Sequence, residues 1–126
     1  MIQVTNLSKH FGAQTLFENI SFTLSRGNKI GFVGRNGSGK STLFKILLGE
    51  EEADSGDILI PKNYTIGALR QHIAFTHRTV REECASALQG DEAFDVYKIE
   101  KMLFGLGFSQ EDLDKDPMSF SGGYQI

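Results

Sequence analysis

The sequence has no apolar run that approaches the roughly 18 residues of a membrane-spanning helix. Its first residues lack the basic segment and the apolar core of a secretory signal peptide. The single cysteine, Cys84, has no partner for an internal disulfide and no second thiol at metal-site spacing. These absences predict a cytoplasmic protein in which Cys84 is a small buried apolar residue.

An excess of positive charge is also missing, since 16 acidic residues outnumber 13 lysines and arginines and give a net charge of −3. This balance provides no electrostatic footprint for nucleic acid or for an anionic membrane. Hydrophobic residues make up 40% and charged residues 23%, which is ordinary for a globular protein. The 126 residues suffice for one small domain with a core.

One stretch, residues 34–42, fits the G-x-x-x-x-G-K-[ST] pattern of a phosphate-binding P-loop. Its glycines fall where a side chain would collide or where φ must be positive, as the backbone wraps a polyphosphate with its N–H groups inward. We expect Lys40 to reach the β- and γ-phosphates and the Ser41 hydroxyl to ligate Mg²⁺. The expected nucleotide-binding residues of the loop are Gly34, Arg35, Asn36, Gly37, Ser38, Gly39, Lys40, Ser41 and Thr42.

The segments around the loop follow the order strand, glycine loop, helix. The apolar run 29–33 predicts a buried strand, and apolar residues at helical spacing after the loop predict a helix that ends at Gly49. Residues 1–24 predict two or three short strands. Residues 57–69 predict a hairpin around a Pro-Lys-Asn turn, and the acidic run 50–56 before it is interpreted as a solvated turn.

From Thr79 onward the pattern becomes helical. Thr79 opens a capping box, a second helix is predicted over 94–104, and Ser109 is placed to cap a short third helix. The apolar stripes of the first two helices comprise Val80, Cys84, Ala87 and Leu88, and then Val96, Ile99, Met102, Leu103 and Leu106.

Three further residues have chemistry that suits a nucleotide site. Phe11, upstream of the P-loop, offers an aromatic face on which a purine could stack, although such a residue is more often part of a core or loop. Gln71, predicted to end a strand, carries an amide oxygen that could ligate Mg²⁺ or position a water. Ser121, followed by Gly122 and Gly123, could open a second phosphate-binding helix N-terminus.

Along the chain, the order is Phe11, the P-loop, Gln71 and the Ser-Gly-Gly segment. This order resembles the ATP-binding cassette family, whose members have an aromatic A-loop, a Walker A P-loop, a Q-loop glutamine and an LSGGQ signature. Phe120 replaces the leucine and Tyr124 the glutamine of that signature, a form that is similar to the ABC-F subfamily of paired cassettes that act on ribosomes. Residues 101–109 also look like the stretch that precedes the signature there. ABC-F proteins usually carry a long two-helix arm between Q-loop and signature, and the interval between Gln71 and Ser121 leaves no room for it.

The resemblance implies an α/β P-loop NTPase fold of the nucleotide-binding-domain type. Residues 1–126 would form a partial domain with an antiparallel β portion and P-loop core (1–71), a helical subdomain (72–120) and the signature (119–126). ATP and Mg²⁺ would be the ligands, with Ser41 and Gln71 on the metal. A second cassette would bind head to tail. The nucleotide held by that cassette would be contacted by Ser121, Gly122 and Gly123 of this chain.

No Walker B strand, general-base glutamate or switch histidine follows the signature in this sequence, so no catalytic base is expected in the chain. We therefore expect an incomplete sheet and little ATPase activity from the chain alone, with hydrolysis in a longer parent. Two alternatives share every motif present. One is the ATP-binding subunit of a membrane transporter, which would have a membrane partner, and the other is a nucleotide-binding module that does not hydrolyse ATP.

Overall fold

The computed structural model describes residues 1–126, which divide into two compact units, Met1–Gly67 and Ala68–Ile126. Each unit is built around its own small apolar core, and each is described by itself. None of the helices has the length and apolarity that crossing a bilayer requires.

The first unit contains a three-stranded antiparallel sheet in the order β2-β1-β3. The strands are β1 (Ile2–Phe11), β2 (Gln14–Leu24) and β3 (Ser55–Leu59). Two residues, Gly12 and Ala13, connect β1 to β2, which confirms strands in the N-terminal stretch and gives their number as two. The central position of β1 means that both of its edges are paired.

The pairing of β1 is irregular in its middle, and this changes which of its residues are buried. Asn6 has a φ of 49°, and the register with β2 shifts between Val4 and Leu7. Such bulges add a residue to one strand and turn the residues that follow. Leu7, Ser8 and Lys9 are therefore buried in succession, where a regular strand would alternate.

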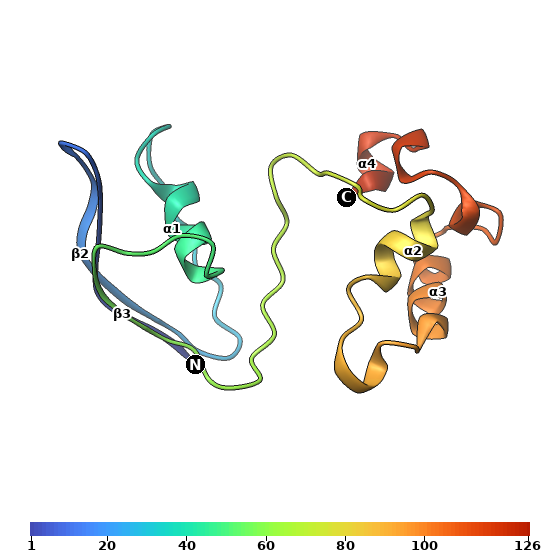
Figure 1. Ribbon diagram of the computed structural model, residues 1–126, viewed down its shortest axis with the longest axis horizontal. Helices are drawn as coiled ribbons and strands as arrows, with labels where there is room; N and C mark the ends of the chain where they lie inside the picture. Colours follow the sequence, from blue (N-terminus) through green and yellow to red (C-terminus); the bar gives the residue numbers. More distant parts are fainter. The chain divides into compact units, whose positions relative to one another are not determined.

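Helix α1 (Lys40–Leu47) lies against one face of this sheet, beside the strands in Figure 1. Its buried residues Leu43 and Ile46 pack with Val4 and Leu7 of β1. The ring of Phe32 extends this core, with its centroid 5.4 Å from that of Phe22. The predicted helix after the glycine loop is thus confirmed. Because its apolar side packs on the sheet, the loop that precedes it is held next to the sheet.

Two predicted strands are absent. Residues 29–33 and 64–69 have no ladder partner, and the side chain of Val33 is fully exposed. The reason is that a strand exists only through hydrogen bonds to a neighbouring strand, and these two segments form no such ladder. The predicted hairpin is wrong as well, because β3 pairs with β1 and not with residues 64–69.

The second unit is helical. It contains α2 (Val80–Ala85), α3 (Val96–Gly105) and α4 (Gly122–Gln125), with short 3₁₀ turns η1 (Gly90–Glu92), η2 (Asp112–Asp114) and η3 (Pro117–Ser119). Its core consists of Val80, Leu103 and Leu113, which come from α2, α3 and η2. The Oγ1 atom of Thr79 accepts a hydrogen bond from the Glu82 amide at 3.2 Å, as the capping box predicts.

Arg81 joins the same three elements through its guanidinium group. Its Nε atom lies 2.8 Å from Glu100 of α3, and its Nη1 atom bonds Asp114 of η2. These partners raise the pKa of Arg81, with the hydrogen bond to Glu100 as the largest cause. The predicted apolar stripes are only partly correct, since Ala87, Met102 and Leu106 are exposed. Helix α3 also begins at Val96, after the predicted start at Phe94, whose ring is exposed.

Candidate functional site

The loop between residues 34 and 39 has the backbone geometry that a P-loop needs. Gly37 and Gly39 have φ angles of 81° and 91°, in the region that L side chains avoid. A β-carbon on Gly34 would lie 2.6 Å from the Ser38 Oγ atom, so a side chain at position 34 would force the Ser38 side chain to shift. All three expected glycine positions are therefore sterically constrained, two by conformation and one by close approach.

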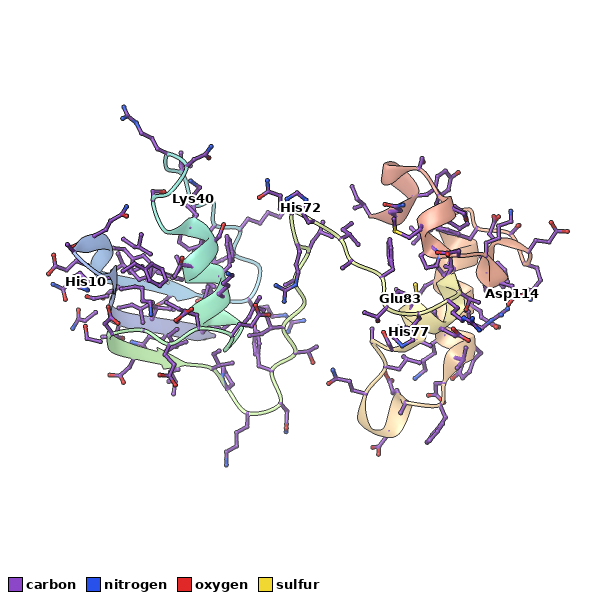
Figure 2. All side chains as sticks on the ribbon, turned by 45° about the horizontal axis from the view of Figure 1, so that its top comes forward. His10, Lys40, His72, His77, Glu83 and Asp114 are labelled. Atoms are coloured by element: carbon purple, nitrogen blue, oxygen red, sulfur yellow. The ribbon has the colours of Figure 1, made fainter.

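Lys40, the first residue of α1, folds its side chain back over this loop. Its Nζ atom donates hydrogen bonds to the carbonyl oxygens of Gly34 and Arg35, the second at 2.8 Å, and to the Ser38 Oγ atom at 3.3 Å. Figure 2 shows Lys40 at the start of α1. The ammonium group therefore lies against the backbone of the loop, and none of its hydrogen-bond partners is a carboxylate.

The start of α1 supplies N–H groups to the same place. The first intrahelical bond runs from the Leu43 amide to the Gly39 carbonyl at 2.9 Å, so the amides of residues 40–42 precede the helical ladder. Gly39 is the N-cap and provides no side-chain acceptor for them. Together with the helix dipole, these amides favour an anion at this end of α1. Ser41 is exposed beside them.

Phe11 ends β1 and is half exposed. The Lys9 Nζ atom lies 5.1 Å from its ring centroid, a cation–π distance. Phe11 pairs with Gln14 across the tight turn, so both its backbone and its ring are supported. The structure therefore places an exposed aromatic ring in the unit that contains the P-loop.

Lys9 was not identified by sequence reasoning. Residues 50–56 are mostly exposed, as expected of a solvated turn, but two of their carboxylates also contact the end of β1. The Lys9 Nζ atom lies 3.0 Å from a Glu51 carboxylate oxygen and 2.7 Å from the Glu52 carbonyl oxygen. The bond from Lys9 holds the pKa of Glu51 below its usual value. Asp54 accepts a hydrogen bond from the His10 amide at 2.6 Å, which is the main cause of its own lowered pKa. The acidic run thus binds the end of β1. The sequence signal for the burial of Lys9 was its position two residues after inward-facing Leu7, because strand residues two apart face the same side.

Gln71 belongs to the second unit and lies in a bend, with its side chain exposed. It does not end a strand, because the preceding residues are unpaired, as described above. The structure thus leaves the amide of Gln71 accessible without bringing it to a defined partner.

The signature segment forms the N-terminus of α4, with Ser121 as the N-cap and Gly122 as the first helical residue. The Ser121 hydroxyl makes no capping hydrogen bond, and both glycines after it are exposed. The two residues that depart from LSGGQ have a structural role, since Phe120 and Tyr124 pack with Phe108. Their ring centroids lie 5.5 Å from that of Phe108.

An open pocket of about 150 Å³ adjoins these rings in the second unit. Its lining includes Phe75, Cys84, Leu106 and Tyr124. Partial burial raises the pKa of the Cys84 thiol, so this cysteine stays neutral. The prediction that it is buried is only partly correct, because Cys84 is half-buried and lines the open pocket.

Comparison with known proteins supports the pattern of motifs. The family model described as "ABC transporter" matches residues 17–126. The putative ATP-binding protein YdiF of Bacillus subtilis (strain 168) is 44% identical over 84 residues, which cover 66% of this chain and 13% of YdiF. The energy-dependent translational throttle protein EttA of Haemophilus influenzae is 39% identical over 71 residues, or 56% of this chain and 13% of EttA.

A longer match is to ABC transporter F family member 5 of Arabidopsis thaliana, 28% identical over 169 residues, which covers 99% of this chain and 24% of that protein. The chain thus spans about a quarter or less of the length of these relatives. Because 169 aligned positions exceed the 126 residues here, the Arabidopsis protein carries residues inside the matched range that have no counterpart in this chain.

Among solved structures, the dimeric structure of MJ0796, a bacterial ABC transporter cassette, superposes with a TM-score of 0.76 at 20% identity. The match covers 99% of this chain and 65% of that one, and it shows the α/β cassette fold. With the family model matching most of its length and F-family proteins among its relatives, the chain belongs to the ABC family of ATPases and is most like its ABC-F members.

Proposed function

We propose that this chain is the ATP-binding portion of an ABC-F-type ATPase and that residues 34–42 hold the triphosphate of Mg·ATP. ABC ATPase domains bind ATP, and the preformed P-loop is the observation that carries the assignment to these residues. Its glycines already have the required positive φ angles, and the Lys40 ammonium already lies over the loop. An anion can therefore be bound with little reorganisation of the backbone.

Each residue of the loop has a definite task in this proposal. The amides at the start of α1 donate to phosphate oxygens, and Lys40 exchanges its bonds to the Gly34 and Arg35 carbonyls for bonds to the β- and γ-phosphates. The Ser41 hydroxyl and the Gln71 amide would each supply an oxygen ligand to Mg²⁺, a cation that prefers oxygen ligands. When bound, Mg²⁺ neutralises charge on the phosphates.

Phe11 would contact the adenine. Its half-exposed ring can stack on a purine, and stacking requires no particular hydrogen-bond pattern. The exposed Ser121 hydroxyl and the bare backbone of Gly122 and Gly123 would contact nucleotide held by a second cassette bound head to tail. MJ0796 was solved as a dimer, which supports the pairing of two cassettes.

The F-family relatives favour a ribosome-associated parent over a transporter subunit, since one of them, EttA, is a translational throttle protein. In such a parent, ATP binding would close two cassettes and hydrolysis would release them. The aromatic signature residues Phe120 and Tyr124 also favour an ABC-F parent over a transporter subunit.

The decisive experiment is calorimetric titration of the purified chain with Mg·ATP and with Mg·tripolyphosphate. We expect both to bind the parent chain and neither to bind Lys40→Ala. Lys101→Ala removes an exposed lysine of α3 and serves as the matched control. Equal ATP affinity in Lys40→Ala and Lys101→Ala would overturn the assignment of the phosphate site.

A further inference from the structure

We infer that Lys9 is a positioning residue for the adenine contact: its buried ammonium holds the Phe11 ring in place and links it to the helix that follows the P-loop. The inference rests on the proposed function, because it presupposes that Phe11 stacks on the base. It adds a residue outside the nucleotide-binding motifs and a specific role for it.

The first observation is the contrast in exposure between the two residues. Lys9 is 7% exposed, which is rare for a lysine, whereas Phe11 is 51% exposed at the same end of β1. The Lys9 Nζ atom lies 5.1 Å from the Phe11 ring centroid. A buried cation under a half-exposed ring restrains the ring while leaving part of its surface accessible.

The second observation is how firmly the ammonium is held. Glu51 and the Glu52 carbonyl oxygen accept hydrogen bonds from it at 3.0 and 2.7 Å, and an Asp54 carboxylate oxygen lies 3.9 Å away. The Asp54 amide also donates to the Ser8 carbonyl at 2.9 Å. The acidic segment is therefore bonded to β1 at Lys9 and on both sides of it, so the cation has little freedom to leave the ring.

The third observation connects this cluster to α1 at both ends of the helix. The segment that binds Lys9 follows the C-terminus of α1, where the Glu50 amide donates to the Lys45 carbonyl at 2.8 Å. On the neighbouring strand, Lys9 pairs with Phe17, and Phe17 lies against Gly39, the N-cap of α1. The position of the Phe11 ring is thereby tied to the helix that carries the P-loop lysine.

The test compares Lys9→Met, which keeps most of the length of the side chain and removes its charge, with Lys9→Arg, which keeps the positive charge on a longer side chain. Lys62→Met, at an exposed lysine of the turn after β3, is the control for a lost positive charge. Mg·ATP and Mg·tripolyphosphate are titrated into each variant of the full chain. We expect Lys9→Met to bind ATP about three- to tenfold more weakly and tripolyphosphate as the parent does, and Lys9→Arg to recover the ATP affinity.

The inference is overturned if Lys9→Met matches Lys62→Met for ATP, or if it loses affinity for ATP and tripolyphosphate equally, because the second result would indicate a purely structural role. Phe11→Ala separates this failure from failure of the proposed base contact. If Phe11→Ala binds ATP as the parent does, the base contact itself is wrong, whatever Lys9 does.

A second readout covers the case in which Lys9→Met does not fold. The chain contains no tryptophan, so Phe11→Trp introduces a single fluorophore at the proposed contact. Its emission should be quenched by ATP, and adding Glu51→Gln, which removes the anionic partner of Lys9, should weaken that response without changing tripolyphosphate affinity. An unchanged ATP response in the double variant would contradict the role of the Lys9 cluster.

Discussion

Gly39 lies so close to Phe17 that a β-carbon on the glycine would sit 3.1 Å from the Phe17 Cδ1 atom. The same glycine has a φ of 91° and caps α1. The last glycine of the P-loop is thus fixed twice, by backbone conformation and by the side chain of β2 against which it packs.

Substitution of this glycine should therefore damage both stability and phosphate binding. We expect Gly39→Ala to lower the free energy of unfolding by about 1–2 kcal/mol from the backbone conformation alone, and to weaken Mg·ATP binding. Gly31→Ala is the matched control, because no atom lies within 4 Å of its β-carbon position. Urea unfolding and calorimetry of both variants check this, and equal behaviour of the two would contradict the described loop geometry.

Phe11 is expected to contribute to ATP binding through the base alone. Phe11→Ala should weaken Mg·ATP binding by about 1–3 kcal/mol, because base–aromatic stacking is lost, and should leave tripolyphosphate binding unchanged. Phe11→Tyr should bind ATP as the parent does, since the aromatic face remains. Parallel titrations measure the difference, and a loss of affinity for both ligands would mean that Phe11 supports the fold rather than the adenine.

The helical unit should depend strongly on Leu113, which is completely buried between α2 and α3. Leu113→Ala should destabilise this unit by about 2–5 kcal/mol, because it removes apolar contacts and leaves a cavity. Leu106→Ala, at a leucine that is 71% exposed, should change the stability by less than about 0.5 kcal/mol. Hydrogen exchange of the α2 and α3 amides reports on this unit directly, and similar protection in both variants would count against the core described here.

Acid should weaken the turn at residues 109–115 through Asp112. Its bond to Lys115 and the Ser109 amide lower the pKa of Asp112 from its usual 3.8 to about 2. As the folded pKa is the lower one, the stabilisation is complete above pH 3.8 and is lost as the pH falls toward 2. Asp112→Asn should therefore lose stability at neutral pH and show a flatter acid dependence, while exposed Asp91→Asn should follow the parent. Urea midpoints at neutral pH and at about pH 2.5 measure this, and parallel curves for the parent and Asp112→Asn would refute it.

Local signals predicted the helical elements well. The glycine loop followed by apolar residues at helical spacing defines α1, and the hydroxyl of Thr79 caps α2 as the box pattern requires. These features depend on contacts within a few residues of each other, so the sequence alone contains what determines them.

Features that depend on distant partners were not predictable in the same way. The apolar run 29–33 resembles a strand, but a strand needs a neighbour, and here it has none. The bulge at Asn6 shifts the burial pattern of β1 and brings Lys9 inside, against carboxylates far along the chain. The Lys9 cluster therefore becomes visible only once β1 and the segment after α1 are placed together.

The most direct test of the proposed site is an NMR titration of the ¹³C,¹⁵N-labelled chain with Mg·ATP, which reports on backbone amides and on aromatic ring carbons. We predict the largest shifts at the amides of residues 34–42 and at the ring of Phe11, and their loss in Lys40→Ala. Tripolyphosphate should shift the loop amides and leave the Phe11 ring unchanged. Shifts that fall outside the loop, or that persist in Lys40→Ala, would contradict the assignment of the P-loop as the ATP site.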